Sequence, residues 1–189
     1  QGYSVAELFN IMETGFVSET GNAAMDSLLS RGGLLNMNYT CSLGIIAMVY
    51  GGILEHLGFL EVCLEKMKFV SKSVGSLVCA TVVSCILFNI ITASQYMSII
   101  LGGRLFIGEF KKKDMLPQTL SRCLEDGGTV TSLIVPWNVD GAFAGATLGV
   151  PVLGFLPFAV FNWVVPIVSI TFGFLNKFQW KTGEIKSTK

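Results

Sequence analysis

The 189-residue chain has few charged residues, because Asp, Glu, Lys and Arg together make up 14% of it and sum to a formal net charge of zero. A soluble domain of this size carries about 25% charged residues. The low charge, together with 51% apolar residues and a mean hydropathy of +0.62, excludes an ordinary soluble domain and indicates a protein embedded in the lipid bilayer. The balanced charge gives no reason to expect a nucleic-acid partner.

The chain also has few histidines and no closely spaced cysteine pair. His56 is the one histidine, which excludes a His-rich metal site. We expect it at a helix end near the membrane interface, with a proton-relay role as the alternative. An enzyme that hydrolyses bonds inside the membrane would need a nucleophile beside a base, and a lone histidine makes that class weak. The cysteines show neither CxxC nor metal-site spacing, so we interpret them as reduced thiols in helices: Cys41, Cys63, Cys79, Cys85 and Cys123.

The chain is rich instead in long apolar runs. Residues 34–54 carry no charge and are long enough for a helix to cross about 30 Å of hydrocarbon, so we predict the first span there. Residues 151–175 form the last predicted span. Residues 1–33 are too polar to span and predict an interfacial helix, roughly 5–16, followed by a glycine-containing loop. No basic segment precedes an apolar stretch and a cleavage site, so we expect no signal peptide.

Residues 73–107 predict a re-entrant hairpin. An apolar stretch is followed by a polar run and then by an apolar piece too short to cross alone. Lys and Arg favour the cytoplasmic side, and they flank the hairpin on both sides, so an even number of crossings must separate the two loops. We therefore predict a hairpin that enters from the cytoplasm and turns near residues 89–95; a full span with a short partner is the alternative. The basic residues are Lys66, Lys68 and Lys72 before it, Arg104 near its end, and Lys111, Lys112 and Lys113 after it.

Residues 120–150 predict a broken span. Pro136 lacks an N–H and clashes with the preceding turn, so two half-helices should flank an unwound centre at Pro136 and Trp137. The predicted topology places the acidic N-terminal segment outside and the basic tail, with Lys177, Lys181, Lys186 and Lys189, inside. Glycines at every fourth position from Gly141 predict a bare face that another helix can approach closely.

Three groups of residues indicate ion chemistry. Unwound backbone inside a bilayer is tolerated where it lines a cavity, and sodium prefers oxygen ligands. A carboxylate at that depth is costly, about 2.5 to 3.5 kcal/mol, and therefore indicates function. The alternatives are hydroxyls and amides that bond only to neighbouring helices, and carboxylates that stabilise a helix N-terminus. The candidates are the hairpin tip, Asn89, Thr92, Ser94 and Gln95; the carboxylates Glu125, Asp126 and Asp140; and, around the break, Thr129, Thr131 and Asn138.

The simplest mechanism is competition of two ions for one carboxylate. We predict a sodium site at Asp126, Asn138 and Asp140, with the hairpin tip supplying neutral oxygens. Trp137 can only donate a hydrogen bond, so it is interpreted as a wall of the site and not as a ligand. Sodium and the proton would be the transported ions, and no resident cofactor is expected.

The chain resembles the C-terminal half of NhaC-type sodium/proton antiporters. The resemblance covers nearly the whole chain and is carried by SRGGLLNM (30–37), NIITASQYMSIILGGRLF (89–106) and LSRCLEDGGTVTSLIVPWNVDGAFAGATLGV (120–150), in this order. It implies an exchanger in a bacterial cytoplasmic membrane, with two inverted repeats that bear hairpins and broken helices. The chain would then be the second repeat, its partner the N-terminal half of the same antiporter, with a homodimer left open.

The chain departs from the family pattern at two site positions. An acidic residue is common where this chain has Ser94, and uncommon where it has Asp140, so the identity of the titrating group and the ion stoichiometry stay open. Relatives of the family also exchange carboxylates, such as malate for lactate. A sodium-coupled carboxylate exchanger is therefore one alternative, and a membrane subunit without transport activity is another.

Overall fold

The computed structural model describes residues 2–30, 32–58 and 73–180, and all regular elements within these ranges are helices. The chain divides into two compact units, residues 1–43 and 44–189. The predicted cytoplasmic connector with Lys66, Lys68 and Lys72, most of the basic tail, Arg31 and Cys63 lie outside the described residues. The prediction of an all-helical protein holds for the part described.

The first unit begins with a helix at the place predicted for the interfacial one. In α1 (Val5–Thr14), Ser4 Oγ accepts from the Glu7 backbone N–H at 3.3 Å, and the Glu7 carboxylate accepts from the Ser4 N–H at 2.7 Å. This reciprocal cap satisfies two donors that the helix start would otherwise leave free. The apolar side chains of Leu8, Phe9 and Met12 are exposed.

A second short helix, α2 (Ala23–Leu29), lies where the sequence predicts a loop. Asn22 Oδ1 caps it by accepting from the Ala24 N–H at 3.1 Å. The 3₁₀ turn η1 (Leu34–Met37) follows and packs against α1. The prediction missed α2 because its seven residues are too few for an apolar period to show.

Asp26 of α2 organises the loop before it. Its Oδ1 accepts from the Thr20 N–H at 2.7 Å, from Thr20 Oγ1 at 2.7 Å and from Ser18 Oγ at 3.0 Å. The backbone hydrogen bond from Thr20, reinforced by the Thr20 hydroxyl, lowers the pKa of the Asp26 carboxyl. Because the folded pKa lies below the unfolded one, the carboxylate stabilises the loop above the unfolded pKa, and this is lost as pH falls through the folded pKa.

Asp26→Asn is therefore expected to speed hydrogen exchange of the Thr20 amide at pH 7. Below the pKa of Asp26 the wild type and the variant should exchange alike, because both then present a neutral side chain. Amide exchange measured at matched pH values checks this. A Thr20 amide protected equally in both proteins at pH 7 would contradict it.

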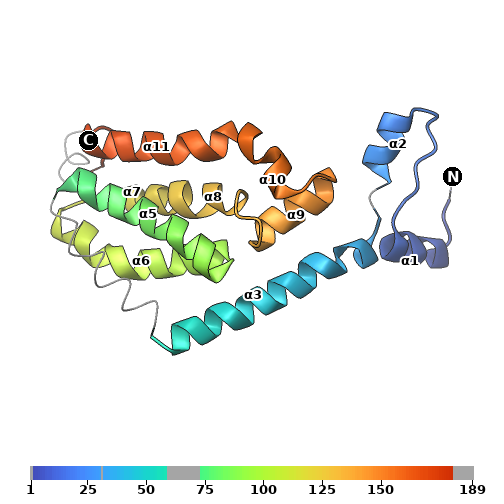
Figure 1. Cartoon of the computed structure of the whole chain (residues 1–189), viewed down its shortest axis with the longest axis horizontal. Coiled ribbons are helices and arrows are strands. Elements are labelled where there is room, and N and C mark those ends of the chain that lie inside the picture. The colour runs from blue at the N-terminus through green and yellow to red at the C-terminus, as the bar shows by residue number, and fades with distance from the viewer. Residues whose placement is uncertain (1, 31, 59–72, 181–189) are drawn as a thin grey trace. The chain divides into compact units, whose positions relative to one another are not determined.

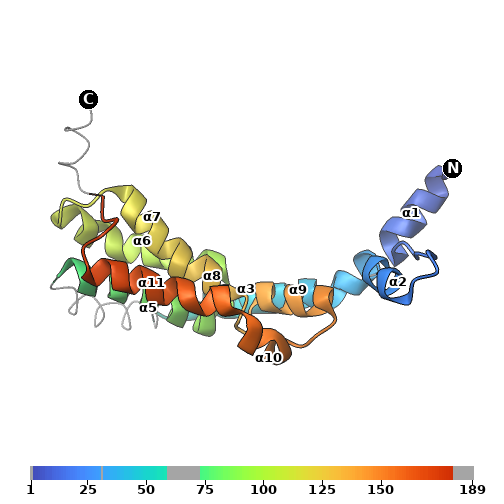
Figure 2. The ribbon, with the colours of Figure 1, turned by 90° about the horizontal axis from the view of Figure 1, so that it is seen from above.

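The second unit is centred on α5 (Val74–Thr92), which packs between α6 (Gln95–Lys112) and α11 (Val160–Phe174), as Figures 1 and 2 show. Close approach to α11 depends on glycine: a Cβ on Gly75 would lie 2.7 Å from Phe174, and one on Gly173 would lie 2.8 Å from Val78. The core between α5 and α6 contains the fully buried side chains of Leu77 and Phe106. These contacts fix the two elements that carry the hairpin tip.

Within the described residues, two stretches are long and apolar enough to span a bilayer, Leu34–Leu54 and α5. The first coincides with the predicted first span and consists of η1 followed by α3 (Asn38–His56), so that His56 lies at a helix end as expected. The described cysteines are free thiols within helices: Cys41, Cys79, Cys85 and Cys123. These features agree with an integral membrane protein.

The predicted hairpin is formed by α5 and α6. The chain reverses at Ala93, which has a left-handed φ of 55°, and at Ser94, which is extended. This turn lies inside the predicted range of 89–95. The returning arm, however, is an 18-residue helix that continues to Lys112, beyond the predicted end at 107. Whether the hairpin is re-entrant stays a prediction.

The broken segment has more pieces than two half-helices. The first half consists of α7 (Pro117–Leu124), the π-helical turn η2 (Glu125–Thr129) and the single turn α8 (Val130–Ser132). Residues 133–138 are not helical, and α9 (Val139–Leu148) is the second half. The interruption thus contains Pro136, as predicted.

Residues 151–175 are not one helix, which corrects the prediction of a continuous last span. They form α10 (Val152–Phe155), the 3₁₀ turn η3 (Leu156–Phe158) and α11. Pro151 and Pro157 lack the N–H that a continuous helix needs. The pair Val139–Leu148 and Val152–Phe158 is bent by 80°, and α11 alone has 15 residues, shorter than a full span.

Candidate functional site

The hairpin tip and the broken segment lie against each other. The indole Nε1 of Trp137 donates to the Ile90 carbonyl at 2.7 Å, and the Val139 N–H donates to the Ala93 carbonyl at 3.3 Å. One bond comes from the unwound centre and the other from the first residue of α9. The hairpin tip and the break, in which the sequence predicts ion-binding residues, therefore contact each other.

Asn89 ties the tip to the first half of the broken segment. Its side chain is fully buried, and Nδ2 donates to the Gly128 carbonyl at 2.5 Å and to Thr131 Oγ1 at 3.0 Å. Thr131 Oγ1 in turn donates to the Gly127 carbonyl at 2.5 Å. Asn89 Oδ1 is buried and has no hydrogen-bond partner among the described residues. A buried amide oxygen of this kind is costly to leave unpaired and is suited to receive a proton donor or a cation.

A hollow of about 210 Å³ opens where α6 and α9 begin. Asn138 caps α9: its Oδ1 accepts from the Asp140 N–H at 3.2 Å, and its side chain is fully buried. Asn138 Nδ2 and Asp140 Oδ2 are buried atoms without a hydrogen-bond partner in the part of the chain described. Ser94 begins α6 without using its hydroxyl as a cap. The lining residues are Gly44, Met48, Ser94, Gln95, Tyr96, Asn138, Val139 and Asp140.

Four of the predicted ion-binding residues share this hollow: Ser94, Gln95, Asn138 and Asp140. Thr92 does not line the hollow, and its hydroxyl donates to the Phe88 carbonyl at 2.8 Å. This bond within α5 is the purely structural role given above as the alternative for such hydroxyls. Asn89 and Thr131 are joined to each other beneath the tip. A carboxylate, two amides and a hydroxyl therefore converge where backbone is unwound.

The other two carboxylates do not line the hollow. Glu125 is exposed and accepts a hydrogen bond from Thr129 one turn on. Asp126 is half-buried on η2, with Oδ2 3.7 Å from the Nε of Arg122. Within the described residues there is no cluster of three His, Cys, Asp or Glu side chains able to hold a metal. The predicted trio of Asp126, Asn138 and Asp140 is thus divided in this conformation, with Asp126 paired to Arg122.

The glycines of α9 lie close to the parts of the chain on either side of that helix. A Cβ on Gly141 would collide with the Val135 carbonyl in the unwound centre, and one on Gly145 would lie 3.3 Å from the Val150 carbonyl. Gly149 ends the helix with a left-handed φ of 69°. These glycines let the chain fold back on itself around the break and the following bend, where a Cβ on Gly145 would also lie 3.7 Å from a side-chain carbon of Val152 on α10.

Sequence reasoning missed the backbone partners of the site. No residue pattern shows that Trp137 reaches the Ile90 carbonyl, because the contact joins elements 47 positions apart. The Arg122–Asp126 pair, in contrast, has the i,i+4 spacing of a helical ion pair and could have been found.

A sequence model described as the Na+/H+ antiporter family matches residues 1–177. The chain is 41% identical over 172 residues to the Na(+)/H(+) antiporter NhaC of Alkalihalophilus pseudofirmus, with 91% of this chain and 37% of that protein covered. It is 31% identical to the malate-2H(+)/Na(+)-lactate antiporter of Bacillus subtilis, with 100% and 41% covered.

A third relative is the arginine/ornithine antiporter ArcD of Halobacterium salinarum, 36% identical with 96% of this chain and 37% of that protein covered. No solved structure matches the chain. The chain spans about two fifths of the length of the curated relatives it matches. These relatives are transporters and not enzymes.

Proposed function

Because the chain belongs to the Na+/H+ antiporter family, we propose that it carries the ion site of a secondary active transporter that exchanges sodium for protons across the bacterial cytoplasmic membrane. The activity belongs to the whole protein, in which an N-terminal half of the antiporter would complete the fold. Apolar helices of spanning length support the membrane setting.

The main support for the proposal is the hollow where the hairpin tip meets the break in the following segment. Asp140 presents there a buried carboxylate oxygen without a hydrogen-bond partner among the described residues, beside the Asn138 amide and the Ser94 and Gln95 side chains. A carboxylate among neutral oxygens binds either a proton or a sodium ion, and each excludes the other. Sodium should therefore bind more weakly as the proton concentration rises.

A second candidate is sodium-coupled carboxylate exchange. Asn138 Nδ2 is a buried donor without a partner among the described residues, and it lies next to the N-terminus of the ten-residue α9. A helix N-terminus with free donors favours an anion. This arrangement suits a substrate carboxylate in the hollow as well as a cation beside Asp140.

Proteoliposomes that contain the full-length protein separate the two candidates. Sodium added outside vesicles with an acidic interior should dissipate the pH gradient, reported by a pH-sensitive dye, without any organic substrate. Uptake of radiolabelled malate or lactate, with no sodium-driven proton movement in its absence, would favour the second candidate.

Trp137→Phe is expected to slow sodium-driven proton movement several-fold at unchanged protein amount. The change keeps an aromatic ring, though a smaller one, and removes the hydrogen bond to the Ile90 carbonyl, which holds the break against the tip and is worth about 0.5 to 1.5 kcal/mol. Trp163→Phe is the matched control, because Trp163 Nε1 also donates to a carbonyl, that of Leu156 at 3.0 Å, but outside the hollow. Equal rates in the two variants would show that the Trp137 bond does not organise the site.

A further inference from the structure

Beyond α11 the chain turns back across α7 in a short segment, residues 176–180, called the strap here. Asn176 and Phe178 have left-handed backbone, with φ of 53° and 56°. Residues other than glycine seldom adopt this conformation. The path of the strap is therefore held by contacts to other elements and not by its own backbone preference.

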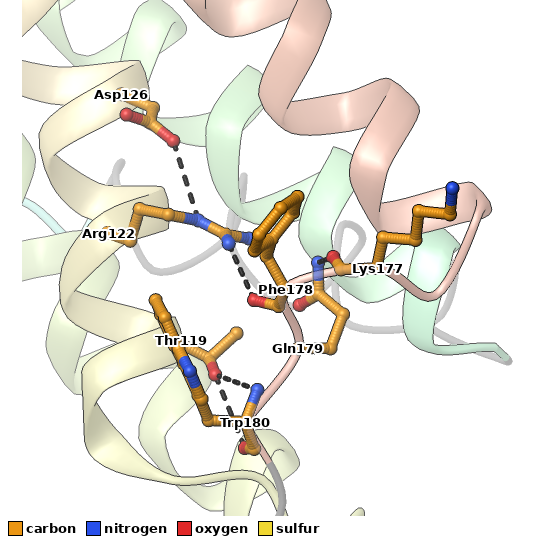
Figure 3. Close-up of polar contacts among 7 residues, drawn as sticks. All are labelled: Thr119, Arg122, Asp126, Lys177, Phe178, Gln179 and Trp180. Atoms are coloured by element: carbon orange, nitrogen blue, oxygen red, sulfur yellow. Dashed lines mark hydrogen bonds and ion pairs between the residues drawn. The ribbon is translucent and has the colours of Figure 1, made fainter.

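The strap docks on the first turn of α7. The Leu116 N–H donates to the Trp180 carbonyl at 2.9 Å, and the Trp180 N–H donates to Thr119 Oγ1 at 3.1 Å. The Thr119 hydroxyl donates in return to the Trp180 carbonyl at 3.3 Å, so Thr119 and Trp180 bond to each other in both directions (Figure 3). Helix starts have free backbone N–H groups, and the strap carbonyl satisfies one of them.

Arg122 lies one turn further along α7 and contacts the strap. Its Nη1 donates to the Phe178 carbonyl at 2.6 Å, and its guanidinium lies 5.6 Å from the centre of the Trp180 ring. Towards the carboxylate the contact is looser, with Nε 3.7 Å from Asp126 Oδ2 and no hydrogen bond from Nε. Figure 3 shows the guanidinium between the strap and Asp126. The strap, more than the carboxylate, sets the position of the arginine.

Asp126 lies close in sequence to residues that contact the hairpin tip. It belongs to η2, whose Gly128 carbonyl accepts from Asn89 at the hairpin tip. The charged groups near it are Arg122 and the exposed Glu125, and the Lys177 side chain extends away from it in Figure 3. A guanidinium and a sodium ion cannot both take the same carboxylate oxygen without mutual repulsion.

We propose that the strap holds Arg122 beside Asp126 as a counterion, so that a cation gains access to Asp126 only when the strap leaves α7. The strap then regulates the access of cations to Asp126, and it acts through Arg122, whose position it sets. This inference rests on the proposed sodium/proton exchange, in which Asp126 is a second carboxylate of the same broken segment.

The first test measures KM for sodium in proteoliposomes with the full-length protein at one fixed pH. Arg122→Gln removes the competing charge, and Thr119→Val loosens the strap without touching either charged group. Both should lower KM about two- to fivefold, the range that a partly exposed ion pair is worth. Thr171→Val is the matched control, because that hydroxyl bonds within its own helix, to the Ile167 carbonyl at 2.7 Å.

The strap claim fails if KM falls in Arg122→Gln but not in Thr119→Val, since the arginine would then hold its place unaided. It fails equally if KM is unchanged or raised in both variants. Thr119→Val keeps the test decisive if Arg122→Gln does not fold.

A second test does not depend on transport. Hydrogen exchange at the Leu116 and Trp180 amides should speed up in Thr119→Val and also in Arg122→Gln, because both variants lose a contact to the strap. Unchanged exchange in Arg122→Gln would show that Arg122 and the strap are not coupled, which overturns the inference. If the wild type shows no sodium/proton exchange, the proposed function fails while this second test still decides the coupling.

Discussion

Asp140→Asn is expected to raise KM for sodium at least about tenfold in the exchange assay. The variant keeps the shape of the side chain but removes the negative charge from the hollow, and a unit charge 4 Å away contributes about 1 kcal/mol in bulk water and about 4 kcal/mol near a protein surface. It also leaves the hollow without a carboxylate that can exchange a proton for sodium. Proton movement driven by sodium should therefore be nearly lost.

Glu109→Gln is the matched control for this change. Glu109 is a carboxylate on α6 that pairs with Lys112 at 2.7 Å and does not line the hollow. The control should exchange ions as the wild type does. An Asp140→Asn variant with wild-type KM, beside an unchanged control, would move the proton and sodium site to another carboxylate.

Gly127→Ala is expected to destabilise the fold around the hairpin. A Cβ at this position would lie 2.7 Å from the Val82 carbonyl and 2.9 Å from Val82 Cα, both on α5. Overpacking against backbone costs about 1 to 3 kcal/mol, because the backbone cannot move aside as a side-chain end can. Thermal unfolding of the detergent-purified protein should shift to lower temperature, and less folded protein should be recovered.

Gly108→Ala is the control for Gly127→Ala. Gly108 is also a helical glycine, on α6, but nothing lies within 4 Å of a Cβ built there. Alanine favours a helix over glycine by about 1 kcal/mol, so this variant should be as stable as the wild type or more so. Similar losses in both variants would show that the close contact between η2 and α5 is not what Gly127 provides.

The broken segment shows how far the sequence could be interpreted. Pro136 inside an apolar run predicts the interruption, because proline cannot continue a helix. The turn at Ala93 and Ser94 follows from a polar run between apolar stretches. The π-helical turn at Glu125–Thr129 has no such local signal, since its shape is set by packing of Gly127 and Gly128 against α5 and α6.

The structure groups the candidate site residues differently from the sequence prediction. Asn138 and Asp140 are two positions apart, so their shared hollow follows from the chain itself. The sequence groups Asp126 with them because it is a carboxylate on the same broken segment. The structure pairs it with Arg122, whose place depends on the strap after α11, a contact across 56 positions that no local pattern contains.

Equilibrium binding of radiolabelled sodium to the purified full-length protein tests the central claim most directly. We propose that the tip and the break form one sodium site whose charge is supplied by Asp140. The wild type and Glu109→Gln should bind sodium saturably at alkaline pH, with binding lost on acidification, and Asp140→Asn should bind sodium at least about tenfold more weakly. Wild-type binding by Asp140→Asn would contradict the claim.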